Sequence, residues 1–168
     1  MSFEKVFVTV GTTQFDKLVS TILNGETLKV LKQKQCRQLA IQIGRGEFEP
    51  KIDDDQISLT FFRLKDSIEN DIEDADLVIS HAGAGTCLDV LEKKKPLITV
   101  INDDLMHNHQ TELADKLSED RYCVSCTCST LADAIQTINP AKLNPFTNNN
   151  DQKCASLIEK FIFYEKVS

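Results

Sequence analysis

The segment Ser80–Asp89 gathers residue types that bind phosphate groups in proteins. It reads Ser-His-Ala-Gly-Ala-Gly-Thr-Cys-Leu-Asp. An imidazole, a hydroxyl and the N–H groups of a first helical turn would converge there on one anion, and glycines let the backbone approach it closely. The alternative is a structural histidine at the end of a strand. We predict a diphosphate-binding turn made of His81, Gly83, Ala84, Gly85 and Thr86.

Two further sets of polar residues extend this candidate site. Asp89 lies three residues after Thr86, so a helix places both on one face, where a carboxylate accepts hydrogen bonds from ribose hydroxyls. Asn108, His109 and Gln110 follow the next apolar run, and amides and imidazoles suit the hydroxyl and N-acetyl groups of a sugar. A polar helix cap is the alternative for these three. Together the sets favour a nucleotide sugar over a bare nucleotide.

Most of the glycines stand where strands are predicted to end. Gly11 follows one strand, Gly44 and Gly46 follow another, and Gly83 and Gly85 follow a third. Parallel strands end at one edge of a sheet, where open α/β sheets bind ligands. Five of the six glycines at this edge favour a phosphate-bearing ligand, although a turn also uses glycine for geometry alone.

The elements that must position these residues alternate along the chain between short β-rich runs and amphipathic stretches. Strands are predicted at Lys5–Val10, Gln38–Ile43, Ile57–Phe62, Asp76–Ser80, Pro96–Ile101 and Tyr122–Cys126. Helices are predicted to begin in Phe15–Leu23 and to cover Ser67–Asp74, Gly85–Lys94, His109–Ser118, Thr130–Ile138 and Gln152–Phe163. This alternation predicts an α/β fold with a Rossmann-like, doubly wound and mainly parallel sheet.

The domain organisation follows from the same pattern. Residues 1–138 are predicted to form one ligand-binding domain, residues 139–150 a linker rich in Asn and Pro, and residues 151–168 a terminal helix. That helix has an apolar stripe of Leu157, Ile158, Phe161 and Ile162. Such a stripe packs on its own domain or docks a partner, and both remain open at this point.

Composition and missing motifs exclude several classes. With 168 residues and a net charge of −7, the chain lacks the basic face of a nucleic-acid coat or of a protein that binds anionic membranes unaided. The longest apolar run, Leu97–Ile101, is strand-sized, and the N-terminus lacks the apolar core of a signal peptide, so we expect a cytoplasmic protein. The third glycine of a dinucleotide fingerprint, a P-loop and a G-x-S-x-G elbow are missing.

No cofactor is predicted. An Asp-x-Asp pair beside the candidate sugar site is missing, and Asp53–Asp55 is expected in a solvated loop. The cluster Cys123, Cys126 and Cys128 lacks the second ligand pair of a familiar zinc site. Ordinary reduced cysteines in a strand and turn are therefore the preferred interpretation, with zinc as the alternative.

Three segments together carry a family resemblance. Val8–Thr13, Ser80–Asp89 and His107–Leu117 resemble the C-terminal, donor-binding domain of GT-B glycosyltransferases of family 28, and the likeness extends over about residues 3–163. It is strongest to the small cytosolic subunits of two-subunit N-acetylglucosaminyltransferases of the endoplasmic reticulum. Those enzymes transfer GlcNAc from UDP-GlcNAc to dolichyl-diphosphate-GlcNAc, which gives the chitobiosyl lipid in the second step of N-glycan precursor assembly. The resemblance implies the fold of the C-terminal half of a GT-B enzyme.

The resemblance also implies roles for individual residues. His81, Gly83, Gly85 and Thr86 match the diphosphate turn of the family, and Asp89 stands where the family commonly has Glu on the ribose. His109 and Gln110 match the positions that contact the donor sugar in the family. At the first of these, bacterial relatives commonly have a side-chain amide. The segment that packs on uracil aligns with Phe62, Arg63 and Leu64. A glycine-rich turn that faces the interdomain cleft aligns with Gly11, Thr12 and Thr13.

The family reacts in a cleft between two domains, and an acceptor-binding domain is missing from this sequence. The resemblance therefore implies a membrane-anchored partner subunit that recruits the chain to the cytosolic face of the endoplasmic reticulum and supplies the lipid-linked acceptor. The expected reaction is a metal-independent inverting transfer whose catalytic base comes from the partner or the rim of the cleft.

Two alternatives stay open. Another split glycosyltransferase, such as an exopolysaccharide enzyme that uses UDP-glucuronate, would want Arg or Lys beside His109 and Gln110, and that segment has neither. A non-catalytic nucleotide-binding adaptor would bind UDP as tightly as UDP-GlcNAc.

Overall fold

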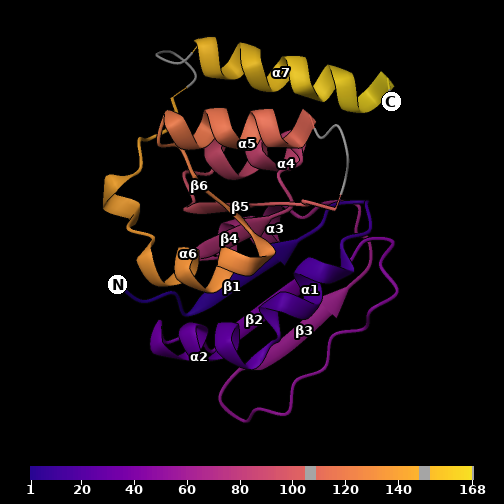
Figure 1. Ribbon diagram of the computed structural model, residues 1–168, viewed down its shortest axis with the longest axis vertical. Coiled ribbons are helices and arrows are strands. Elements are labelled where there is room, and N and C mark those ends of the chain that lie inside the picture. Colours follow the sequence, from indigo (N-terminus) through magenta and orange to yellow (C-terminus); the bar gives the residue numbers. More distant parts are fainter. Residues whose placement is uncertain (105–108, 148–151, 168) are drawn as a thin grey trace.

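A single parallel sheet organises the protein. The computed structural model describes residues 1–104, 109–147 and 152–167, and in these ranges six strands pair side by side (Figure 1). The strands are β1 (Lys5–Thr9), β2 (Gln38–Gln42), β3 (Ser58–Phe62), β4 (Leu77–Ser80), β5 (Leu97–Ile101) and β6 (Val124–Thr127). Every pairing between them is parallel. The predicted α/β fold class is confirmed.

The strand order is β3-β2-β1-β4-β5-β6. The chain therefore builds outward from β1 in one direction, and then returns to pair β4 on the other side of β1. Val8 of β1 stands between Ile41 of β2 and Ile79 of β4 in the register. This reversal beside β1 is the topological switch point, where the loops after two neighbouring strands diverge and leave a crevice for ligands.

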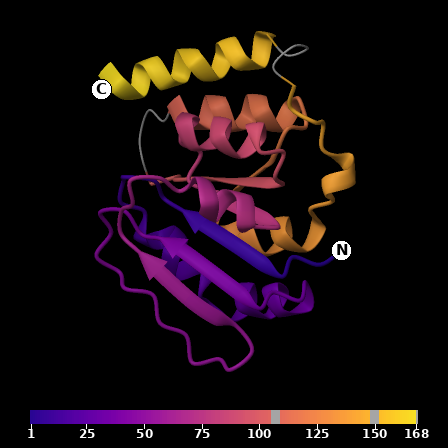
Figure 2. The same ribbon diagram turned by 180° about the vertical axis from the view of Figure 1, so that it is seen from behind.

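Helices cover both faces of the sheet, as the views in Figures 1 and 2 show. One face carries α1 (Asp16–Ile22), α2 (Gly25–Gln33) and α6 (Leu131–Thr137). The opposite face carries α3 (Glu69–Asp74), α4 (Ala84–Glu92), α5 (His109–Glu119) and α7 (Gln152–Val167). Two short 3₁₀ turns, Cys128–Thr130 and Pro140–Lys142, precede α6 and follow it.

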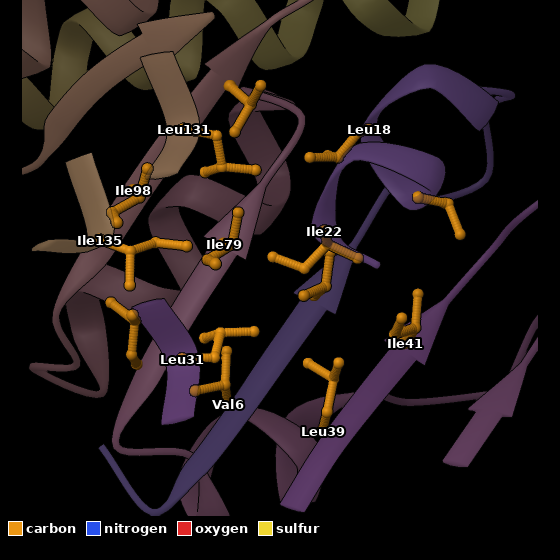
Figure 3. Packing of buried hydrophobic residues seen from close by; sticks show 14 of the residues in the cluster. Val6, Leu18, Ile22, Leu31, Leu39, Ile41, Ile79, Ile98, Leu131 and Ile135 are labelled. Carbon is orange, nitrogen blue, oxygen red and sulfur yellow. The ribbon is translucent and has the colours of Figure 1, made fainter. Parts of the chain in front are cut away.

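The central strands are apolar runs in the sequence because they are buried between helices on both faces of the sheet. Ile79 and Ile98 point toward α1, α2 and α6, where they meet Leu18, Leu31 and Ile135 (Figure 3). Their neighbours Val78 and Leu97 point to the other face, because successive side chains of a strand alternate. A central parallel strand is thus mostly apolar on both of its faces.

The helix α2 is missing from the sequence prediction, which begins one helix in Phe15–Leu23 and names no second helix before the next strand. The structure ends α1 at Ile22 and starts a second helix at Gly25. The side chain of Asn24 accepts a 2.8 Å hydrogen bond from the backbone N–H of Thr27, which caps the new helix. This capping side chain separates two helices in a stretch whose apolar periodicity alone suggests one.

The C-terminal helix α7 packs on its own domain, against α4 and α5. Two residues of the predicted stripe, Ile158 and Phe161, are buried there, and Ile162 is half-buried. The side chain of Leu157 lies outside the described ones. Part of the predicted linker is also packed, since Phe146 is buried with its ring 5.9 Å from that of Tyr122.

Candidate functional site

A cavity of about 930 Å³ opens at the switch point, beside the carboxyl ends of β1 and β4. The structure brings most of the predicted site residues to it. Its lining includes Gly11, Thr12, Thr13, His81, Gly83, Gly85, Thr86, Asp89 and Gln110. These residues come from segments that are as many as 99 positions apart in the sequence. A volume of this size is in the range of pockets that hold cofactors and nucleotides.

His81 is a buried polar residue of this lining. Its side chain is 7% exposed, and its backbone N–H donates a 3.2 Å hydrogen bond to the carbonyl of Thr9. Burial lowers the pKa of the imidazole to about 4, and the nearby backbone of Thr9 opposes that shift only in part. The ring is therefore neutral at physiological pH. Its Nδ1 atom is buried and has no hydrogen-bond partner among the residues that the structure describes.

The glycines beside His81 are required by its ring. A Cβ on Gly11 would stand 2.8 Å from Cε1 of His81, and a Cβ on Gly83 would stand 2.5 Å from Nε2. Gly11 also has a φ of +62°, a backbone angle that residues with a side chain rarely adopt. Two glycines thus make the slot that holds the imidazole, which is a reason for their presence in addition to close backbone approach by an anion.

The N-terminus of helix α4 faces the cavity. Its N-cap residue is Gly83, no side chain caps it, and its first turn has no acidic residue. The first N–H groups of a helix lack partners within the helix and carry partial positive charge. Gly85 and Thr86 of that turn line the cavity, whereas Ala84 is buried behind them. An anion would find both hydrogen-bond donors and a favourable field here.

Asp89 reaches the same cavity from the next turn of α4. Burial raises the pKa of its carboxyl group, and the carboxylates of Glu92 and Glu69 raise it further, while Lys93 opposes them. The residue as a whole is nevertheless exposed to solvent. A strong hydrogen-bond acceptor is thus held near the phosphate-binding turn in an environment that disfavours its charge.

The loop after β2 has a structural role that the glycine pattern does not predict. Gly44 and Gly46 are absent from the cavity lining, so the expectation that they serve a ligand is wrong for this cavity. A Cβ on Gly44 would lie 2.3 Å from the carbonyl oxygen of Thr13, and a Cβ on Gly46 would lie 2.2 Å from Oδ1 of Asp16. These glycines let the loop pack against the turn after β1.

Gln42 is a lining residue that the sequence analysis misses. It is 3% exposed at the end of β2, and its Oε1 accepts a 2.5 Å hydrogen bond from the hydroxyl of Thr9. The same hydroxyl oxygen accepts a 2.9 Å hydrogen bond from the backbone N–H of Gly11. The signal is a polar residue at the end of an otherwise apolar strand, since buried polar groups in such places need specific partners.

The predicted uracil segment, Phe62–Leu64, does not line the cavity. The next residue along the chain, Lys65, does. The ring of Phe62 stacks on Phe7 at 6.3 Å, with the Lys65 ammonium 3.8 Å from its centre. The guanidinium of Arg63 donates a 2.6 Å hydrogen bond to the carbonyl of Gly46. The side chains of Phe62 and Arg63 therefore support the fold, whereas Leu64 is exposed. The uracil role stays a prediction.

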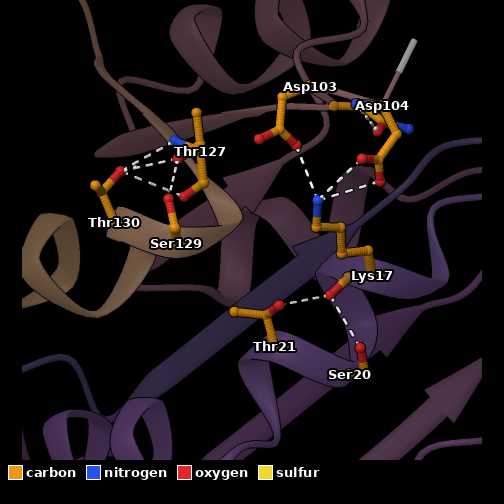
Figure 4. A network of polar contacts seen from close by, with 9 residues as sticks. Lys17, Ser20, Thr21, Asp103, Asp104, Thr127, Ser129 and Thr130 are labelled. Atoms are coloured by element: carbon orange, nitrogen blue, oxygen red, sulfur yellow. Dashed lines mark hydrogen bonds and ion pairs between the residues drawn. The ribbon is translucent and has the colours of Figure 1, made fainter.

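The predicted sugar residues are only partly described. Asn108 lies outside the described residues, and so does the side chain of His109, whose backbone opens α5. Gln110 lines the cavity. The segment that leads toward them from β5 is held by Lys17 of α1, whose ammonium contacts Asp103 at 3.1 Å and Asp104 at 3.1 Å (Figure 4).

The three cysteines of the predicted cluster are packed in the fold. Cys123 and Cys128 are buried, Cys126 is half-buried, and burial raises the pKa of the Cys126 thiol to about 12. In the described ranges, no group of three His, Cys, Asp or Glu residues lies in an arrangement that would hold a metal ion. The thiols therefore contribute to the apolar core, Cys123 on one face of the sheet and Cys126 and Cys128 on the other.

The comparisons with known proteins can now be set beside this geometry. Residues 5–161 match the glycosyltransferase family 28 C-terminal domain. The chain belongs to that family. The family resemblance seen in the three sequence segments is confirmed.

Two members of this family show how much of the chain is shared. The UDP-N-acetylglucosamine transferase subunit ALG13 of Mus musculus is 45% identical over 130 residues, which are 77% of this chain and 11% of the mouse protein. The same-named subunit of Saccharomyces cerevisiae is 35% identical over an alignment of 193 positions that covers 94% of this chain and 96% of the yeast protein. The chain thus spans about a tenth of the mouse relative and nearly all of the yeast relative.

Two solved structures of similar proteins agree with the fold. An NMR structure of ALG13 superposes with a TM-score of 0.71 at 31% identity, over 96% of this chain and 98% of that one. MurG of Acinetobacter baumannii superposes with a TM-score of 0.63 at 17% identity, over 94% of this chain and 45% of MurG, which shows the shared fold of a GT-B half. None of the helices that the structure describes combines the length and apolar character needed to cross a membrane.

Proposed function

We propose that this chain is the donor-binding subunit of a UDP-N-acetylglucosamine transferase. The observation that carries the proposal is the buried Nδ1 of His81, which has no partner among the described residues and belongs to a residue of the switch-point cavity. A buried polar atom without a partner costs about 1–3 kcal/mol. A diphosphate oxygen that accepts a hydrogen bond from this neutral imidazole would recover that energy.

The rest of the cavity suits the other parts of the donor. The N–H groups at the start of α4 and the hydroxyl of Thr86 would bind the diphosphate as it leaves, so that its developing charge is stabilised by the fold. Asp89 would accept from the ribose hydroxyls and Gln110 would contact the sugar. No metal ion is needed for these contacts, and an inverting transfer fits them.

The reaction we propose is transfer of GlcNAc from UDP-GlcNAc to dolichyl-diphosphate-GlcNAc, the second step of N-glycan precursor assembly. Support comes from the relatives named as UDP-N-acetylglucosamine transferase subunits. The word subunit also supports a partner, which we propose is membrane-anchored and holds the chain at the cytosolic face of the endoplasmic reticulum. The partner or the rim of the cleft supplies the base that takes the proton of the acceptor 4-hydroxyl.

The donor assignment is tested by titrating the ¹⁵N-labelled chain with UDP-GlcNAc, UDP-glucuronate and UDP. We expect shift changes centred on residues 81–89 with all three, and the tightest binding for UDP-GlcNAc. A preference for UDP-glucuronate would favour a different split glycosyltransferase. Equal affinity for UDP and UDP-GlcNAc would favour an adaptor. Unperturbed 81–89 signals with all three would contradict the site.

The catalytic assignment is tested with His81→Ala in the complex with its membrane partner. Loss of the imidazole should abolish GlcNAc transfer while the amide spectrum of the variant keeps the dispersion of the folded chain. His81→Asn serves as a second variant that retains a hydrogen-bonding side chain of smaller size. Near-normal transfer by His81→Ala would remove His81 from the phosphate site.

A further inference from the structure

The outer wall of the cavity is made by the last helix of the chain. Phe161, Ile162 and Lys166 of α7 line the cavity together with residues of α4 and α5. Figures 1 and 2 place the C-terminal end of α7 on the side of the molecule where α5 begins. Phe161 is 5% exposed and anchors the helix there. Ile162 and Lys166 are four residues apart, so they share one face of α7.

The charged residues described so far in the cavity lining would not neutralise the negative charge of a bound diphosphate. Asp66, Glu69, Asp89 and Glu92 all line the cavity, and the buried His81 is neutral at physiological pH. A UDP-sugar has two negative charges on its diphosphate. The positive end of α4 amounts to only about half a charge. The site therefore needs a cation from the remaining lining residues.

Two of the lining lysines are already engaged. The ammonium of Lys65 contacts Asp71 at 2.7 Å and lies over the ring of Phe62. The ammonium of Lys93 forms ion pairs with Glu69 and Glu73, which raise its pKa. Lys166 differs from both, since it lines the cavity without an ion pair to any part of the chain that the structure describes.

We propose that Lys166 binds the diphosphate of the nucleotide sugar, so that α7 supplies the charge which the Rossmann core lacks. This inference rests on the proposed function. The local alternative is that Lys166 only complements the negative C-terminal end of α7, where basic residues are favourable. That role would stabilise the helix, but it would not distinguish a ligand with phosphate groups from one without them.

The test compares UDP with uridine as ligands of the full 168-residue chain, with dissociation constants measured by NMR shift titration. Lys166→Gln should weaken UDP binding about fivefold, the size expected of a partly exposed charged contact, and leave uridine binding unchanged. Lys166→Arg should keep most of the UDP affinity. Lys160→Gln is the matched control, because Lys160 is exposed on the same helix and outside the lining.

Three results would overturn the inference while the proposed function stands. UDP binding of Lys166→Gln could equal that of the wild type. Uridine and UDP binding could weaken together, which would indicate a packing role for α7. Lys160→Gln could weaken UDP binding as much, which would indicate bulk charge alone. Absence of UDP binding by the wild-type chain is a separate outcome, and it would overturn the proposed function together with this inference.

Discussion

The imidazole of His81 lies directly against Gly83, with Nε2 only 2.5 Å from the position that a Cβ on Gly83 would take. Two residues later, a Cβ on Gly85 would meet no atom within 4 Å. The two glycines of this G-x-G turn therefore have different roles. Gly83 makes room for the His81 side chain, and Gly85 leaves space that a ligand can use.

This difference predicts opposite effects of alanine at the two positions. Gly83→Ala should displace the His81 ring and destabilise the fold by about 1–3 kcal/mol, as overpacking does. Gly85→Ala adds a methyl group inside a helix and should stabilise the fold by about 0.5–1 kcal/mol. Urea unfolding measures both changes. The proposed phosphate contact predicts that Gly85→Ala weakens UDP binding despite its higher stability, and unchanged UDP binding would argue against a close approach there.

The neutral state of His81 predicts a dependence of stability on pH. Its pKa is about 4 in the fold and 6.5 in the unfolded chain, so the unfolded chain binds more protons between these values. Stability is then fully present above about pH 6.5 and is lost as the pH falls toward 4, by at most about 3 kcal/mol. Urea unfolding at pH 7 and pH 5 measures the loss.

His81→Gln is the control for that titration, because it removes the ionisable ring and leaves the other titrating groups in place. The variant should lose less stability than the wild type between pH 7 and pH 5, whatever its absolute stability. Carboxylates with lowered pKa, such as Glu69 beside Lys93, lose their contribution only near and below their ordinary value of 4.5. Equal losses in the two proteins would contradict a neutral, buried His81.

Asp89 is predicted to lower the stability of the fold and to strengthen UDP binding. Its pKa is raised by burial and then by Glu92 and Glu69, so the fold disfavours its charged form and its contribution to stability falls as the pH rises through that pKa. Asp89→Asn should therefore stabilise the fold at pH 7, by less than about 1 kcal/mol because the group is partly solvated. The same change should weaken UDP binding, since an amide is a weaker acceptor for ribose hydroxyls.

Asp89→Glu is the matched variant that keeps the charge and lengthens the side chain. We expect it to retain UDP binding better than Asp89→Asn. A less stable Asp89→Asn would show that the carboxylate supports the fold itself. Asp89→Asn with wild-type UDP affinity would remove this residue from the ribose contact.

The anchoring of α7 is tested by two phenylalanines of the same helix. Phe161 is 5% exposed and Phe163 is 65% exposed. Phe161→Ala should cost about 3–5 kcal/mol of unfolding free energy and weaken UDP binding, because it loosens a wall of the cavity. Phe163→Ala should stay within about 0.5 kcal/mol of the wild type. Comparable losses of stability in the two variants would contradict the packing of α7 on α4 and α5.

Several features could be predicted from short stretches of sequence. The strands appear as apolar runs because both faces of a parallel sheet are buried, and β4 (Leu77–Ser80) is buried at every position. The turn Gly83–Thr86 predicts the start of a helix, and α4 begins at Ala84. These features depend on interactions between residues close in sequence, which a local pattern of residue types records directly.

The roles of single glycines could not be assigned in this way. Gly44 and Gly46 share a strand-end position with Gly11, but their loop packs on Thr13 of the loop after β1 and on Asp16, the first residue of α1. Only the pairing of β1 with β2 brings those loops together. The short capped break at Asn24 was missed for a related reason, because an apolar period of 3.6 continues across two helices that share one buried face.

The sequence by itself determined the class of the fold, the family of the chain and the core of a phosphate-binding turn, because these depend on local residue order. The tertiary structure decided that His81 fits between Gly11 and Gly83, that Gln42 joins the lining, and that α7 closes the cavity with Lys166. His81 lies 70 positions after Gly11, and Lys166 lies 155 positions after it. These contacts exist only because the whole chain buries its apolar surface at once, which no short segment encodes.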